Sequence, residues 1–197
     1  MSTKRVSTER VRVSTGGASA ERVSARRASI ERVPAQGPLC RIGLISDTHG
    51  FLDPRVMAAF RGVDRILHAG DIGRPHVLWE LQALAPTDAV LGNTDSAICV
   101  GEDLPLMRHL PICGVDIVLV HDQRNASAAL QAVGAADAVV FGHSHRAVVA
   151  HDDGLLWINP GSATRPRGNE PRESVAVLEL AEDAEPTARI LFLDEFS

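Results

Sequence analysis

The sequence predicts an α/β domain in which two β-sheets are flanked by helices. From residue 39 onward, short apolar runs are separated by amphipathic stretches. The first half of this region alternates strands with helices, and the second half is richer in strands. Strands as apolar as these must be buried on both faces, and two sheets with helices outside bury them in that way.

The alternating half begins with apolar runs that are bounded by turn residues and predict strands at 41–46, 64–68 and 88–91. A short helix is expected at 53–60, because Asp53 can cap its N-terminus and a proline follows at the first helical position. A second helix is expected at 75–84, because its apolar side chains recur at helical spacing.

The strand-rich half contains two predicted hairpins. One joins 106–112 to 115–120 around Gly114, and the other joins 147–150 to 155–158 around an Asp-Asp-Gly turn. The remaining predicted elements are a helix at 126–133 and strands at 138–141, 174–180 and 189–193.

Residues 1–38 differ from the rest, which is the predicted domain at 39–197. They repeat Arg-Val-Ser-Thr and Glu-Arg-Val, and they contain no aromatic residue. Such a segment buries too little surface to offset the entropy lost on ordering, so we expect a disordered, low-complexity arm. An organellar transit peptide and a basic arm for anionic partners are alternatives, but three glutamates count against the first.

Composition excludes several classes of protein. No stretch has the apolar length of a membrane span, and the N-terminus lacks the apolar segment of a signal peptide. Three widely spaced cysteines form neither a disulfide framework nor a zinc ribbon, so we expect a cytoplasmic protein. The arm carries eight Lys or Arg and three Glu, whereas the whole chain has a net charge of −5, so the domain is strongly acidic. Nucleic acid is therefore an unexpected partner.

Metal-capable side chains follow five of the predicted strands, where ligands bind in open α/β sheets. They are Asp47 with His49, Asp71, Asn93, His121, and His143 with His145. One strand-final Asp or Asn is more often a turn former than a ligand, but five such strand ends in succession indicate a site. Glycines stand beside these positions, as expected where the backbone turns sharply or approaches another group closely.

Carboxylates, an amide and four imidazoles without a thiolate favour manganese, iron, zinc or nickel, and manganese is our first expectation. The set is too large for one ion and suits two ions that share a carboxylate.

The motifs resemble the five blocks of the calcineurin-like metallophosphoesterase superfamily. The blocks read Asp-Thr-His at 47–49, Gly-Asp at 70–71, Gly-Asn-Thr-Asp at 92–95, His121, and Gly-His-Ser-His at 142–145. The short length, together with Asn-Pro-Gly-Ser at 159–162 and Arg165 and Arg167, resembles the small bacterial and archaeal phosphodiesterases of that superfamily.

The resemblance implies a four-layer αββα sandwich of two mixed sheets flanked by helices. It implies a first metal held by Asp47, His49, Asp71 and His145, and a second held by Asp71, Asn93, His121 and His143. A metal-bridging hydroxide would attack the phosphorus of a small phosphodiester, with Asp71 and Asn93 as the catalytic residues. Asn93, Thr94 and Arg167 are the candidate contacts to substrate.

Two departures from the family pattern matter. Thr94 stands where the superfamily usually has a histidine, the presumed proton donor to the leaving oxygen, and a hydroxyl is too weak an acid for that role. Asp122 follows His121 where a glycine is usual; it could add a ligand, orient His121 or face solvent.

Other residues are expected to have structural roles. His68 is expected to pack behind Asp71, and Trp79 is expected in the core or at an interface between subunits of a homo-oligomer. The alternatives to the enzyme are a scaffold that keeps the fold for protein contacts and a nuclease of the same superfamily.

Overall fold

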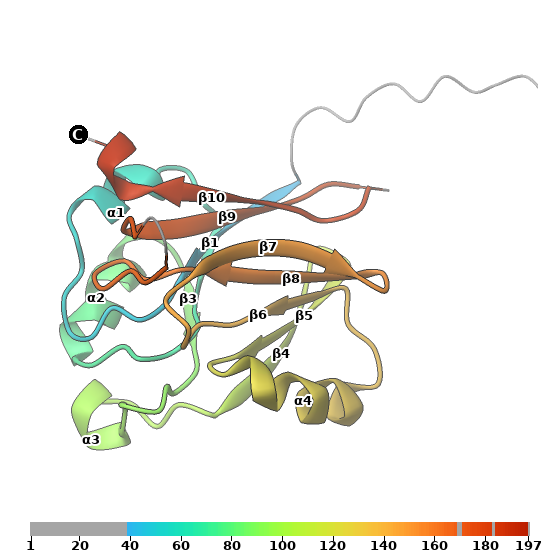
Figure 1. Ribbon diagram of the computed structural model, residues 1–197, viewed down its shortest axis with the longest axis horizontal. Helices are drawn as coiled ribbons and strands as arrows, with labels where there is room; N and C mark the ends of the chain where they lie inside the picture. The colour runs from blue at the N-terminus through green and yellow to red at the C-terminus, as the bar shows by residue number, and fades with distance from the viewer. Residues whose placement is uncertain (1–38, 169–170, 183, 197) are drawn as a thin grey trace, which may run out of the picture. The chain divides into compact units, whose positions relative to one another are not determined.

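The structure is a computed structural model, and it describes residues 39–168, 171–182 and 184–196. The arm predicted for residues 1–38 lies outside the described residues. The described chain forms two five-stranded sheets, each of which mixes parallel and antiparallel pairs (Figure 1). The fold class predicted from the sequence is therefore confirmed.

The first sheet has the strand order β10-β9-β1-β2-β3. Its strands are Thr187–Phe192 (β10), Ser174–Leu180 (β9), Cys40–Ile45 (β1), Arg65–His68 (β2) and Thr87–Ala89 (β3). Strand β1 lies at the centre, parallel to β2 and antiparallel to β9. The central strands are the most apolar, and both faces of β1 are buried, as expected for a sheet covered on both sides.

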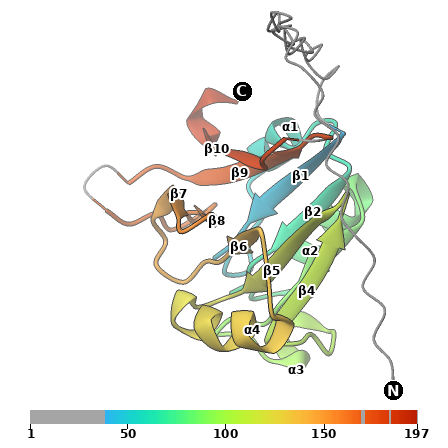
Figure 2. The ribbon, with the colours of Figure 1, turned by 90° about the vertical axis from the view of Figure 1, so that its right-hand side faces the viewer.

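The second sheet has the strand order β4-β5-β6-β8-β7. Its strands are Met107–Ile112 (β4), Val115–Val120 (β5), Ala138–Val140 (β6), Leu155–Pro160 (β8) and Ala147–Asp152 (β7). The two predicted hairpins, β4 with β5 and β7 with β8, form its outer pairs. Figure 2 shows that α4 lies beside the second sheet.

Three apolar layers separate the elements. Helices α1 (Arg55–Ala59) and α2 (Pro75–Leu84) pack on the outer face of the first sheet, and α4 (Ala126–Val133) packs on the outer face of the second. Side chains from the facing sides of both sheets, such as Leu44 and Leu119, fill the middle layer. The order is helix, sheet, sheet, helix. Within the described residues, no helix is long and apolar enough to cross a bilayer.

Several elements differ from the sequence prediction. Strand β3 ends at Ala89, two residues earlier than expected, so Asn93 lies in a turn some residues after the strand rather than at its end. A short helix, α3 (Ala97–Val100), and two 3₁₀ turns, η1 (Gln123–Asn125) and η2 (Leu193–Glu195), were not predicted. Each is a single turn, too short for an apolar period to mark it. Trp79 is 62% exposed, so of its two expected locations the core is wrong, and an interface between subunits stays a prediction.

Candidate metal centre

The parallel strands of both sheets direct the predicted ligands to one place. Loops that follow β1, β2 and β3 in the first sheet, and β5 and β6 in the second, carry all seven side chains. Because these loops share one edge of the molecule, residues nearly one hundred positions apart meet: Asp47 accepts a hydrogen bond from the backbone N–H of His143 at 3.1 Å.

Four donors form a compact cluster, Asp47, His49, Asp71 and His145, whose ligand atoms all lie within 4.8 Å of one another. The Nε2 atoms of His49 and His145 are 3.3 Å apart, and Asp47 Oδ1 lies 3.2 Å from His145 Nε2. Asp47 Oδ1 has no hydrogen-bond partner and is the one such buried side-chain oxygen or nitrogen among the described residues. An orphaned buried carboxylate oxygen facing imidazole nitrogens fits a divalent cation.

The other three predicted ligands form a second group around the Asn93 amide. Asn93 Oδ1 lies 3.0 Å from His121 Nε2 and 2.8 Å from His143 Nδ1. The rings of His121 and His143 are nearly perpendicular, at 82°. This group is more open than the first, since Asn93 is exposed and His143 half-buried.

Asp71 lies between the two groups. One carboxylate oxygen, Oδ2, is 3.9 Å from His49 Nε2, and the other, Oδ1, is 3.6 Å from His121 Nε2. Oδ1 also accepts a hydrogen bond from the backbone N–H of Thr94 at 2.9 Å, which fixes the carboxylate. Each group therefore has access to a different oxygen of the same side chain.

Backbone strain is concentrated at the candidate ligands. Seven described non-glycine residues have left-handed backbone, and five of them are Asp47, His49, Asp71, His143 and His145. The other two lie in hairpin turns. Such residues cost on the order of 1–3 kcal/mol each and persist where surrounding structure holds them, typically at functional sites.

Close approaches between the loops explain two of the glycines. A Cβ atom on Gly92 would lie 2.1 Å from the backbone nitrogen and Oδ1 of Asp71. On Gly70 it would lie 2.8 Å from the backbone of Gly92 and from His121 Nδ1. Only glycine allows these loops to meet, as the sequence analysis proposed for glycines beside the ligands.

Two histidine rings are oriented by backbone carbonyls. His121 Nδ1 donates to the Ala69 carbonyl at 2.8 Å, and His145 Nδ1 donates to the Arg165 carbonyl at 2.6 Å. The donated proton fixes the tautomer and leaves each Nε2 with a lone pair directed at the donor groups. Metal-binding histidines are usually held in this way.

His68 lies behind the site, as expected from the sequence. Its Nδ1 accepts from the backbone N–H of Gly70 at 3.2 Å, and its Nε2 therefore donates to Thr48 Oγ1 at 3.0 Å. Thr48 Oγ1 donates in turn to the carbonyl of Ile72 at 3.1 Å. The ring is completely buried, and burial lowers the pKa of His68 to about 4. A neutral His68 thus connects the loops after β1 and β2.

Asp95 anchors the loops after β2 and β3, a role that the sequence analysis did not assign. Its carboxylate accepts from the backbone N–H groups of Ile72, Gly73 and Gly92 at 2.8–2.9 Å. The sequence shows that Asp95 stands three residues after Gly92, but this spacing does not predict hydrogen bonds to backbone groups of two different loops.

The end of β8 and the loop that follows it hold two of the loops that carry candidate ligands. Ser162 Oγ donates to the carbonyl of Asp47 at 2.8 Å, and Asn159 Nδ2 donates to the carbonyl of Gly142 at 2.7 Å. The Asn-Pro-Gly-Ser motif therefore fixes the loops that carry Asp47 and His143.

The pKa values of the two carboxylates in the cluster, Asp47 and Asp71, shift in opposite directions. Burial raises the pKa of Asp47, more than its neighbouring histidines lower it. Burial also acts to raise the pKa of Asp71, but the Thr94 N–H and nearby imidazoles outweigh it and lower that pKa. Burial lowers the pKa of His49, which favours the neutral, ligating form. A bound divalent cation would offset the burial of these carboxylates.

Asp122 contacts Arg124 and His143, and whether it adds a metal ligand stays a prediction. Its Oδ1 accepts from the Arg124 backbone N–H at 2.9 Å, and its carboxylate pairs with the Arg124 guanidinium, which lowers the pKa of Asp122 to about 2. Oδ2 also lies 3.8 Å from His143 Nε2. Asp122 therefore starts the η1 turn and faces His143 rather than His121.

Most of the other residues considered in the sequence analysis are exposed. Thr94 is exposed beside Asp71, and Arg165 and Arg167 are exposed on the loop that follows β8. His109 and His151 are exposed and His76 half-buried, away from the donor groups. The cysteines are free, with Cys40 buried and the other two exposed.

Two mixed sheets with a cluster of two carboxylates and two imidazoles at their edge fit a hydrolase that acts on phosphoesters with a divalent metal. The chain belongs to the calcineurin-like phosphoesterase superfamily, whose domain model matches residues 40–183.

Two curated relatives cover most of the domain. A probable metallophosphoesterase of Methanothermobacter thermautotrophicus is 37% identical over 150 residues, which is 71% of this chain and 85% of the relative. A phosphodiesterase of Methanocaldococcus jannaschii is 29% identical over 139 residues, which is 61% of this chain and 82% of the relative.

Solved structures share the fold at lower identity. A predicted phosphoesterase of Streptococcus pneumoniae superposes with a TM-score of 0.62 at 23% identity, covering 79% of this chain and 90% of that one. Vps29 of Entamoeba histolytica, solved with zinc, superposes with a TM-score of 0.60 at 20% identity, covering 78% and 99%. At these identities the likeness shows the fold alone.

Proposed function

We propose that the protein is a phosphodiesterase that uses two divalent transition-metal ions, with manganese as the first candidate and nickel, iron or zinc as alternatives. The observation that supports two ions is the position of Asp71, whose two oxygens face different donor groups at 3.9 Å and 3.6 Å. A carboxylate placed in this way is suited to bridge.

The seven donors divide into two sets in this proposal. Asp47, His49, Asp71 and His145 hold the first ion, and Asp71, Asn93, His121 and His143 hold the second. The neutral imidazoles supported by carbonyl acceptors favour borderline divalent ions over magnesium or calcium. Two such ions, when bound, activate water as a nucleophile and offset charge on phosphoryl oxygens.

The residues of the chain have distinct tasks. The Thr94 backbone N–H and Asp95 hold Asp71 and its loop in place, so the donors are arranged before substrate enters. Asn93 is exposed, and its amide would contact a substrate phosphate from the open side of the second group. Thr94 and Arg167 are the other proposed contacts to substrate.

A diester substrate is supported by the curated relative that is named a phosphodiesterase. Thr94 limits which diesters react well. Its hydroxyl can donate a hydrogen bond but cannot protonate a leaving oxygen near neutral pH. Aryl esters, whose leaving group departs as a stable anion, should therefore be the best substrates.

The test is hydrolysis of bis(4-nitrophenyl) phosphate and 4-nitrophenyl phosphate by metal-stripped protein supplied separately with manganese, nickel, zinc and magnesium. We expect metal-dependent hydrolysis, faster for the diester. Asp71→Asn should abolish it, whereas Asp116→Asn, the same change at a half-buried residue of β5 that is not a candidate ligand, should not. Activity without metal, or activity retained by Asp71→Asn, would contradict the proposal. The cytoplasmic location and homo-oligomeric state expected from the sequence stay predictions.

A further inference from the structure

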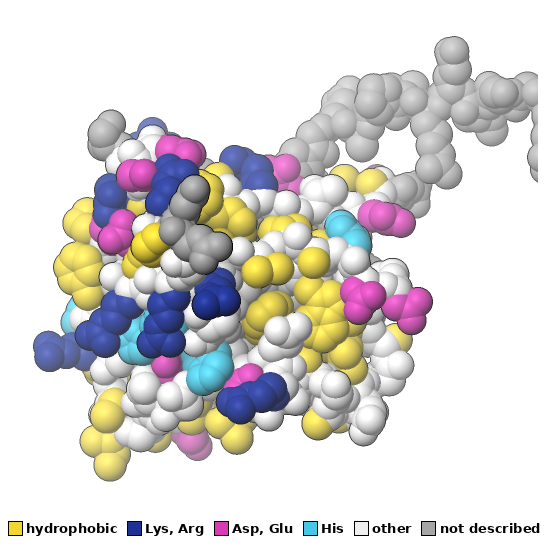
Figure 3. Space-filling view, viewed as in Figure 1, with side chains coloured by type: hydrophobic (Ala, Val, Ile, Leu, Met, Phe, Trp, Pro, Cys, Tyr) yellow, Lys and Arg dark blue, Asp and Glu magenta, His cyan; other side chains and the backbone are white. Residues whose placement is uncertain are grey.

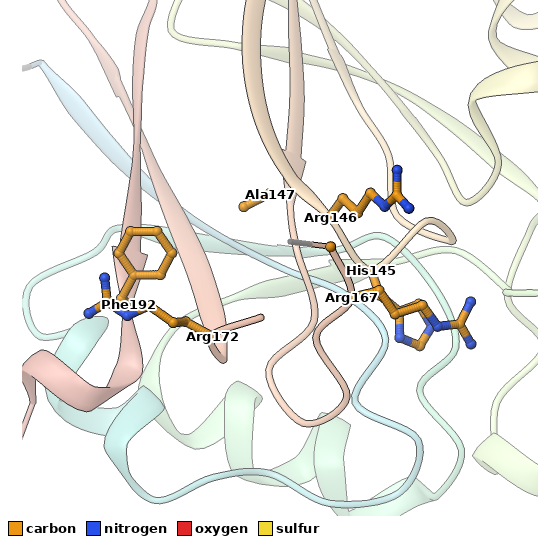
Figure 4. A pocket seen from close by; sticks show the side chains of 7 residues that line it. His145, Arg146, Ala147, Arg167, Arg172 and Phe192 are labelled. Atoms are coloured by element: carbon orange, nitrogen blue, oxygen red, sulfur yellow. The ribbon is translucent and has the colours of Figure 1, made fainter. Parts of the chain in front are cut away.

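A cleft of about 330 Å³ opens beside the first donor cluster. One of its walls is His145, and Arg146, Arg167, Arg172 and Phe192 line the rest (Figure 4). Ligand pockets in proteins start at about 300 Å³, so the cleft has room for one small group of a substrate. Because His145 belongs to both, the cleft adjoins the metal centre.

The arginines of the cleft differ in how their charges are used. Arg172 pairs with Asp194 and Glu195, and its guanidinium lies 3.9 Å from the centre of the Phe192 ring, so its charge is largely neutralised. The guanidinium groups of Arg146 and Arg167 have no hydrogen-bond or ion-pair partner within the part of the chain that the structure describes. They supply positive charge that an anionic ligand can use.

Backbone contacts hold the loops that carry these arginines beside the metal centre. The Arg167 backbone N–H donates to the His145 carbonyl at 3.0 Å, and the Arg165 carbonyl accepts from His145 Nδ1. The loop after β8 and the loop after β6 therefore hold each other. An anion bound by Arg146 and Arg167 would have a defined position relative to a phosphate at the metal centre.

The distribution of charge over the surface agrees with an anionic ligand. The domain as a whole is strongly acidic, yet in Figure 3 dark blue basic side chains lie around the cyan histidines toward the lower left of the face. Local positive charge on an acidic protein attracts a small anion to that site, whereas the rest of the surface repels large polyanions.

We propose that the cleft binds a second phosphate group of the substrate, so that the preferred substrate is a small phosphodiester with an additional phosphate beyond the scissile one. This rests on the proposed phosphodiesterase function. Arg146 and Arg167 bind the second phosphate, and the Phe192 side of the cleft accepts the apolar part of the substrate that connects the two phosphates.

The test compares two diesters with the same leaving group. Thymidine 5′-(4-nitrophenyl phosphate) carries only the scissile phosphate, and its 3′-phosphorylated derivative carries a second one. We expect kcat/KM for the second compound to be at least about tenfold higher, mainly through KM, with an advantage that shrinks as salt rises. A derivative with a 3′-carboxymethyl group shows whether any anion suffices or a phosphate is required.

Arg146→Gln with Arg167→Gln should reduce the ratio of the two kcat/KM values to near one. Arg61→Gln, which removes an exposed arginine next to α1, should keep the wild-type ratio. A wild-type ratio near one, or a ratio unchanged in the double variant, would overturn the proposal.

A binding measurement separates this proposal from the catalytic one. Calorimetry of thymidine 3′,5′-bisphosphate and thymidine 5′-monophosphate should show tighter binding of the bisphosphate, lost in the double variant. If neither ester is hydrolysed but this difference holds, the proposed function fails and the cleft assignment stands. If both esters are hydrolysed but the two nucleotides bind equally, the cleft assignment fails alone.

Discussion

The buried His68 should make the stability of the metal-free protein strongly dependent on pH. Both of its nitrogens are committed: Nδ1 accepts from Gly70, and Nε2 donates to Thr48. Protonation would place a second proton on Nδ1, directly opposite the Gly70 N–H. Burial disfavours the charged ring and lowers the pKa of His68 from 6.5 to about 4, and the hydrogen bonds leave no free nitrogen for a second proton.

The sign and size of the effect follow from linkage. Between pH 6.5 and 4 the unfolded chain binds a proton that the folded protein does not, so stability falls as pH falls. A pKa difference of about 2.5, at about 1.4 kcal/mol for each pKa unit, corresponds to about 3 kcal/mol. This contribution is present above pH 6.5 and is lost by about pH 4.

Urea unfolding of chelator-treated protein at pH 7 and at pH 4 measures this loss. His68→Gln removes the titrating ring, so the variant should lose about 3 kcal/mol less than the wild type over that interval. His151→Gln, which removes an exposed histidine from β7, is the matched control. Equal losses in wild type and His68→Gln would refute the assignment of His68 as a neutral, doubly hydrogen-bonded ring.

Three further predictions concern the leaving group, the loops and the arm. The enzyme should cleave aryl diesters about 10²–10⁴-fold faster than alkyl diesters, and Thr94→His should narrow that gap in steady-state assays; equal wild-type rates would refute our account of Thr94. Gly92→Ala should weaken metal binding in calorimetry and destabilise the fold by about 1–3 kcal/mol or more, because its Cβ would lie 2.1 Å from Asp71, whereas Gly154→Ala meets no atom within 4 Å. A chain beginning at Pro38 should keep its activity and its thermal midpoint, and loss of either would show that the arm belongs to the domain.

The fold was predictable because its strands carry two local signals together. Strands β1, β2, β5 and β6 are short apolar runs followed by a polar residue, and a glycine lies in the turn after β1, β2 and β6. The order of strands was not predictable, since the neighbours of β1 include β9, which lies more than 120 residues later. Strand register, and the pairing of strands that are far apart in the sequence, depend on packing between distant segments.

The identities of the candidate ligands could be predicted from the sequence, but their arrangement in space could not. Their types and positions after strands can be read from the sequence, whereas the orphaned Asp47 oxygen and the two faces of Asp71 depend on the meeting of separate loops. Asp95 and Arg146 were missed for the same reason. Asp95 acts through three backbone N–H groups, and Arg146 has a role only because its cleft adjoins His145.

The central claim is that one carboxylate, Asp71, connects two metal-binding groups. Crystals grown with manganese and measured at its absorption edge test this claim most directly. We expect two anomalous peaks per chain, one among Asp47, His49, Asp71 and His145 and the other among Asp71, Asn93, His121 and His143. A single peak, or peaks away from these side chains, would contradict it.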